Sequence, residues 1–127
     1  MSEFGLRFHS MIHPASYISP SVSFGHGVAV LAGNTIASGV SLGDHCLVNR
    51  GGSIGHDCAI GEFATIGPGV HLASGVQVGH AAFIGIGATV IENIIIGHNA
   101  RVAAGAVVLR NVESETVVAG VPARPFK

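Results

Sequence analysis

One histidine of this sequence stands directly beside a carboxylate, in the stretch Ile54-Gly-His-Asp-Cys-Ala-Ile60. An imidazole titrates near neutral pH, so His56 suits the removal of a proton from an amine or a hydroxyl. Asp57 could orient and polarise that ring. The pair predicts general-base chemistry; the alternative is an ordinary solvated histidine, because a single surface histidine is weak evidence by itself.

The two isoleucines of this stretch belong to a six-residue apolar repeat. Each repeat has an apolar residue, called position i below, often a glycine at i+1, and a small or apolar residue at i+4. Such a hexapeptide period is typical of a β-helix. The seventeen positions i are Ile12, Ile18, Phe24, Val30, Ile36, Leu42, Val48, Ile54, Ile60, Ile66, Leu72, Val78, Ile84, Val90, Ile96, Val102 and Val108.

The repeat predicts short strands that face one core. Position i+4 and the next position i are two residues apart, so both side chains point to the same face of a strand. The residues at i+1 to i+3 must turn the chain, and we expect glycine there to ease the bend. The repeat also divides the chain into a lead-in segment at 1–11, a β-helix at 12–113, and a closing strand with a tail at 114–127.

Composition agrees with a single small domain that associates with copies of itself. Of the 127 residues 48% are hydrophobic and only 10% are charged, which predicts burial both in a core and between subunits. A formal charge of −1 argues against nucleic-acid binding. No stretch approaches the roughly 18 apolar residues of a membrane helix, and the N-terminus lacks a signal-peptide pattern. We therefore expect a cytoplasmic protein without a membrane partner.

Four stretches together resemble a known family: Ile12-His-Pro-Ala-Ser, His56-Asp-Cys-Ala-Ile-Gly-Glu-Phe, Pro68-Gly-Val and Val118-Ala-Gly-Val-Pro-Ala-Arg. They are similar to the hexapeptide-repeat acetyltransferases of the sialic-acid O-acetyltransferase and UDP-4-amino-sugar N-acetyltransferase group. The resemblance implies an all-β fold, a left-handed parallel β-helix with three strands per coil. It also implies a homotrimer that uses acetyl-CoA to acetylate a hydroxyl or amine of a sugar.

The resemblance assigns roles to individual residues. It implies that His56 is the general base and that Asp57 raises its basicity. It places the backbone amide that faces the thioester oxygen at Ser74. The acetyl-CoA contacts of the family fall on Thr65, Ile86 and Ala104.

The chain departs from the family at three points. The position before the base, often acidic in relatives, is Gly55, and Thr65 stands where relatives have an imidazole. Relatives also carry an N-terminal nucleotide-sugar-binding domain, and the sequence starts near the end of it. We expect either a trimmed chain or a stand-alone β-helix with another acceptor.

An eighteen-residue coil would place some of these residues on the same edge of the β-helix. Residues eighteen apart lie on one edge, so Ser74 is expected one coil, about 4.8 Å, from His56. Ile86 and Ala104 form an apolar strip on a second edge. Because six residues extend at most about 20 Å, the two edges are far apart in one subunit. His56 and the strip are therefore expected to meet only across a subunit interface.

Two other function classes remain open from the sequence. Three histidines, His26, His80 and His98, share the third edge with Asp44 and Glu62. They are expected to form a solvated edge; the alternative is a metal site like that of γ-class carbonic anhydrases, whose histidine spacing the chain does not match. The other class is a non-catalytic structural β-helix. Cys46 and Cys58 occupy inward i+4 positions and are predicted to be buried free thiols.

Overall fold

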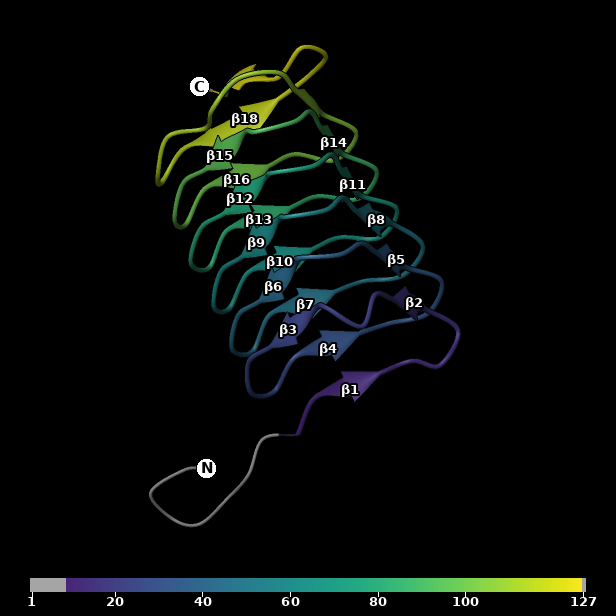
Figure 1. Cartoon of the computed structure of the whole chain (residues 1–127). Coiled ribbons are helices and arrows are strands. Elements are labelled where there is room, and N and C mark those ends of the chain that lie inside the picture. Colours follow the sequence, from purple (N-terminus) through teal and green to yellow (C-terminus); the bar gives the residue numbers. More distant parts are fainter. Residues whose placement is uncertain (1–8, 127) are drawn as a thin grey trace, which may run out of the picture.

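The computed structural model describes residues 9–126, and its strands form three sheets, parallel except at the last strand, that wrap into a triangular prism (Figure 1). Every strand up to β17 has two residues. The first sheet, called sheet A, contains β1 (Met11–Ile12), β4 (Ala29–Val30), β7 (Leu47–Val48), β10 (Thr65–Ile66), β13 (Phe83–Ile84), β16 (Arg101–Val102), β18 (Val117–Ala119) and β19 (Arg124–Pro125).

The other two sheets complete the prism. Sheet B contains β2 (Tyr17–Ile18), β5 (Thr35–Ile36), β8 (Ser53–Ile54), β11 (His71–Leu72), β14 (Thr89–Val90) and β17 (Val107–Val108). Sheet C contains β3 (Ser23–Phe24), β6 (Ser41–Leu42), β9 (Ala59–Ile60), β12 (Gln77–Val78) and β15 (Ile95–Ile96). The chain visits sheets A, B and C in turn, and residues 9–126 contain no helix. The predicted all-β, left-handed parallel β-helix is confirmed.

The register confirms an eighteen-residue coil. Thr65 of β10 pairs with Leu47 of β7 on one side and with Phe83 of β13 on the other. Backbone N–H groups next to each inward residue donate to the coil above, for example from Gly55 to Leu72 at 2.8 Å. Residues eighteen apart therefore lie on one edge, as the arithmetic required.

Positions i and i+4 fill the core, as predicted. Ile36, Ile84 and Ile96 are fully buried, and so are the small residues Ala64 and Ala88 between them. The first coil differs from the rest. Its inward residues Ile12 and Phe24 remain 43% and 38% exposed, because no described coil lies beneath them to cover them.

Glycine occurs at i+1 for a reason different from the expected one, which was to ease the turn. The left-handed backbone that the turn needs falls at i+3, where Gly51 and Gly87 have φ of 76° and 71°. At i+1 the constraint is the next coil: a Cβ on Gly79 would lie 2.6 Å from the His98 backbone nitrogen. Glycine at i+1 thus permits close stacking of coils. On the corner between sheets C and A every i+1 residue is glycine, namely Gly25, Gly43, Gly61, Gly79 and Gly97.

This distinction makes a stability prediction. Gly79→Ala forces a methyl group against the backbone of the next coil and should lower the free energy of unfolding by about 3 kcal/mol. Gly87→Ala is the matched control, because its Cβ would meet nothing within 4 Å and only the positive φ is strained. That strain should cost about 1 kcal/mol. Urea denaturation of both variants decides the point; an equal or larger loss for Gly87→Ala would contradict it.

The six-residue repeat ends after Val108. Val112 still reaches the core and bridges to Ile96, and β18 then pairs parallel to β16. The chain finally reverses, so that β19 lies antiparallel to β18 at the C-terminal end of the prism. Of the predicted lead-in at 1–11, residues 1–8 lie outside the described residues, as does Lys127 of the predicted tail. The described part of the chain contains no helix that could span a membrane.

Candidate active site

His56 lies on the corner between sheets B and C, in the turn from β8 to β9. Its side chain is 63% exposed, and its Nδ1 lies 3.0 Å from Oδ2 of Asp57. The backbone carbonyl of His56 accepts a hydrogen bond from Gly75 at 3.0 Å, which ties the turn to the next coil. Because a carboxylate only accepts hydrogen bonds, this contact places the imidazole proton on Nδ1. Nε2 of His56 makes no hydrogen bond to another residue in the range 9–126.

Asp57 occupies the left-handed turn position, with φ of 61°. Aspartate tolerates this conformation better than most side chains do. Gly39, one coil below, leaves room for the carboxylate: a Cβ at Gly39 would overlap Oδ1 of Asp57. The backbone N–H of Asp57 donates a hydrogen bond to the Ser38 carbonyl at 3.0 Å. The fold therefore fixes the Asp57 backbone and leaves space for its carboxylate beside His56.

Ser74 stands one coil above His56 on the same corner, as expected. Gly55 packs against it so closely that a Cβ there would lie 2.7 Å from the Ser74 backbone nitrogen. The backbone N–H of Ser74 donates no hydrogen bond to another residue in the range 9–126. This N–H is therefore available to a ligand on the same edge as His56.

Thr65, Ile86 and Ala104 lie together in a shallow hollow of about 430 Å³ on sheet A and its corner with sheet B. Ile86 is 56% exposed although it is a large apolar side chain. The hollow also includes Phe83 and Arg101, whose guanidinium carbon lies 4.7 Å from the Phe83 ring centroid. Sequence reasoning missed these two residues; the signal was that both occupy the outward position of successive sheet A strands.

The two groups of predicted site residues occupy different corners of the prism. His56, Asp57 and Ser74 are on the corner between sheets B and C. The hollow with Thr65, Ile86 and Ala104 belongs to sheet A and the corner between sheets A and B, and its lining includes none of the first group. One subunit therefore presents the two halves of the candidate site on separate edges.

The third corner, between sheets C and A, carries His26, His45, His80 and His98. His98 Nδ1 lies 2.8 Å from Oγ of Ser114, and the His80 ring meets the edge of Phe63 with centroids 5.8 Å apart. Within residues 9–126 no three His, Cys, Asp or Glu side chains are grouped so that they could hold a metal ion.

Both cysteines are buried free thiols, as predicted. Burial raises the pKa of Cys46 to about 12, and it also raises the pKa of Cys58. Sγ of Cys58 donates to the Ala73 carbonyl at 3.1 Å. Cys58 lies in the turn that holds His56, whereas Cys46 directly precedes β7 of sheet A. Both buried thiols have little nucleophilic character.

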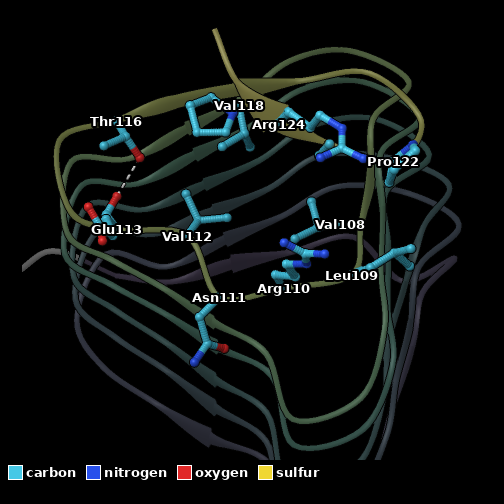
Figure 2. Close-up of a pocket in the computed structure, with 12 residues that line it drawn as sticks. Val108, Leu109, Arg110, Asn111, Val112, Glu113, Thr116, Val118, Pro122 and Arg124 are labelled. Atoms are coloured by element: carbon cyan, nitrogen blue, oxygen red, sulfur yellow. Dashed lines mark hydrogen bonds between the residues drawn. The ribbon is translucent and has the colours of Figure 1, made fainter.

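A separate cavity of about 370 Å³ lies at the C-terminal end of the prism (Figure 2). Val108, Val112 and Val118 form apolar walls, and Arg110 and Arg124 also line it. It arises where the returning C-terminal segment caps the last coil. None of the six predicted site residues lines it, so it is distinct from the candidate site.

The chain is similar to a known protein family and to several solved structures. Residues 75–110 match the family described as hexapeptide repeat of succinyl-transferase. No curated protein sequence gives a significant match. The chain is similar to a variant of GDP-perosamine N-acetyl transferase from Caulobacter crescentus, solved with CoA and GDP-perosamine. That match has 41% identity over 97% of this chain and 59% of the relative, with a TM-score of 0.96.

Two further solved structures are also similar to this chain. The acetyltransferase domain of PglB from Neisseria gonorrhoeae, in complex with acetyl coenzyme A, is 34% identical over 96% of this chain and 60% of that chain, with a TM-score of 0.94. WeeI from Acinetobacter baumannii is 28% identical over 91% and 57% respectively, with a TM-score of 0.85. The chain thus spans somewhat under two thirds of each of these relatives.

The fold, the six-residue repeat and the similarity to solved structures together show which class of protein the chain resembles. The chain is a left-handed parallel β-helix built on a hexapeptide repeat. More narrowly, nearly all of it is similar to part of a GDP-perosamine N-acetyl transferase solved with CoA and to part of an acetyltransferase domain solved with acetyl coenzyme A. The resemblance stated from the sequence is confirmed.

Proposed function

We propose that the chain is an acetyl-CoA-dependent acetyltransferase that acts on an amine or hydroxyl of a sugar or nucleotide-linked amino sugar. The observation that carries the proposal is the exposed His56–Asp57 pair, in which Nδ1 of His56 lies 3.0 Å from Oδ2 of Asp57. It occurs in a chain 41% identical to a sugar N-acetyl transferase solved with CoA and its nucleotide sugar. We also propose that the protein is cytoplasmic.

In the proposed reaction Nε2 of His56 accepts the proton of the acceptor amine or hydroxyl. The acceptor nitrogen or oxygen forms a bond to the thioester carbonyl carbon, and the negative charge on the carbonyl oxygen is stabilised by the Ser74 backbone N–H. The carbon–sulfur bond then breaks. The proton held by His56 passes to the leaving sulfur, which gives free CoA thiol and the acetylated acceptor. Asp57 stabilises the imidazolium that forms between these steps.

Acetyl-CoA is proposed to lie in the hollow on sheet A. Ile86 and Ala104 offer a smooth apolar strip to the pantetheine arm. Thr65 faces the same hollow, where its hydroxyl can hydrogen-bond a thioester or amide group in place of an imidazole. The hollow and His56 lie on different corners, so the proposed site is complete only when one subunit's His56 corner meets the neighbour's hollow.

The outward face of sheet A supports a homotrimer. Its outward residues are largely apolar: Met11, Ala29, Leu47, Thr65, Phe83, Arg101 and Val117. Sheet B presents a more polar set: Tyr17, Thr35, Ser53, His71, Thr89 and Val107. Covering sheet A with a second copy removes apolar surface from water. Such a contact joins different patches of the two copies and closes as a ring.

Mixed trimers test the shared site. His56→Ala and Ile86→Arg should each be nearly inactive, the first without its base and the second with a charge in the pantetheine strip. When the two variants are unfolded and refolded together, an active site needs His56 from one copy and Ile86 from the next. Random assembly should therefore restore about a quarter of wild-type activity.

The control is the double variant His56→Ala, Ile86→Arg refolded with wild type. Turnover is measured as thiol released from acetyl-CoA over a panel of amino sugars, sialic acids and nucleotide sugars. If the mixture of single variants stays as inactive as each variant alone, while the control mixture is active, the shared site is wrong.

A further inference from the structure

The corner between sheets C and A carries an unusual aromatic cluster, and we consider it together with the proposed trimer. Phe63 has φ of 60° and remains 53% exposed. Its ring stacks on His45, with centroids 5.1 Å apart, and meets His80 at 5.8 Å. A bulky side chain with positive φ strains the backbone and persists where the surroundings favour it. Much of this ring has no cover from its own subunit.

The proposed active site restricts how three prisms can be arranged. The His56 corner lies between sheets B and C, and the hollow reaches the corner between sheets A and B. Both corners therefore border sheet B. A ring of three copies can bring these corners together in two ways: either sheet B faces the threefold axis, or the opposite corner does.

The composition of the sheets favours the second arrangement. With sheet B at the axis, the apolar face of sheet A would stay in water. With the corner between sheets C and A at the axis, sheet A of one copy packs against sheet C of the next. Sheet C suits such a contact because most of its outward residues, Ser23, Ser41, Ala59, Gln77 and Ile95, are small.

We infer that the corner between sheets C and A points to the threefold axis, where the Phe63 rings of three copies pack together. The inference rests on the proposed shared site. Burial of three rings at the axis offsets the strained backbone at Phe63. His45 and His80 hold each ring against its own subunit. Phe63 belongs to the coil that carries His56, so this contact sets the separation of the subunits at the level of the active site.

The first test replaces Phe63 with asparagine. Asn93 and Asn99 already occupy the equivalent turn position, with φ of 60° and 56°, so Phe63→Asn keeps the local backbone. Loss of a buried aromatic at an interface centre should raise the dissociation constant of the trimer at least roughly tenfold. Sedimentation equilibrium measures it, and thiol release should fall on dilution. Tyr17→Asn is the control, since this 63% exposed aromatic lies on sheet B and should leave assembly unchanged.

The second test reports which part of the prism is at the axis. Asn99→Cys places a thiol on the proposed axial corner, and Thr89→Cys places one on sheet B. Both positions are exposed, whereas the native cysteines are buried. After labelling with pyrene maleimide, excimer fluorescence should appear for Asn99→Cys only. Excimer from Thr89→Cys only, or from neither variant, would overturn the inference.

The outcomes separate the two proposals. If Phe63→Asn and Tyr17→Asn both assemble like a trimeric wild type, the axial contact is wrong and the shared site stands. If the wild type transfers acetyl groups as a monomer, the shared site is wrong, and the axial contact falls with it.

Discussion

Replacement of His56 by alanine should lower turnover by roughly 10²–10⁴-fold, the usual contribution of a general base. Folding and assembly should not change, because the side chain is 63% exposed and only its backbone carbonyl is tied to the next coil. Acetyl-CoA affinity should also stay close to wild type, since the proposed hollow belongs to the neighbouring subunit. Thiol release, thermal unfolding and isothermal titration with acetyl-CoA measure the three quantities.

Two variants sharpen this expectation. His71→Ala removes another exposed histidine, one that lies 2.6 Å from Oγ of Ser53 on sheet B, and should leave turnover unchanged. Asp57→Asn keeps a side chain that tolerates positive φ but removes the charge that stabilises the imidazolium. It should lower turnover less than His56→Ala does. Near wild-type turnover by His56→Ala on the preferred acceptor would refute the assignment.

The architecture could be predicted because every six-residue repeat gives the same information about which residues are buried. Each inward position from Val30 to Val108 sees the same environment one coil away, so a six-residue period leaves little choice of what is buried. The handedness and the number of strands per coil were not contained in the period and came from the resemblance. The exposed first coil, with Ile12 and Phe24, was not foreseen because its sequence obeys the same repeat as the covered coils.

The candidate site was predictable where stacking alone decides it. Ser74 lies above His56, and Ile86 and Ala104 line one hollow, because each pair is eighteen residues apart. The sequence could not show why glycine recurs at i+1, since that depends on the spacing between coils. Nor could it show the left-handed backbone of Asp57 and Phe63. These conformations fall at i+3, where most turns contain glycine or asparagine. Asp57 instead has a carboxylate that contacts His56, and Phe63 has a large ring that contacts His45 and His80.

Two isoleucines that are two residues apart should differ strongly in their effect on stability, and Ile84 should have the largest effect. Ile84 is completely buried in the core, so Ile84→Ala should lower the free energy of unfolding by about 2–5 kcal/mol through lost burial and a cavity. Ile86 is 56% exposed on the corner that borders the hollow. Ile86→Ala should change the free energy of unfolding by less than about 0.5 kcal/mol.

The same pair should behave in the opposite way toward acetyl-CoA. Ile86→Ala removes apolar surface from the proposed pantetheine strip and should raise the dissociation constant of acetyl-CoA roughly tenfold, which corresponds to the loss of one or two buried methylene-sized contacts. Ile84→Ala, measured under conditions where it is folded, should bind acetyl-CoA nearly as the wild type does. Urea denaturation and isothermal titration on both variants give the four values. If Ile86→Ala binds acetyl-CoA normally, the hollow on sheet A is not the pantetheine site, whatever the outcome at His56.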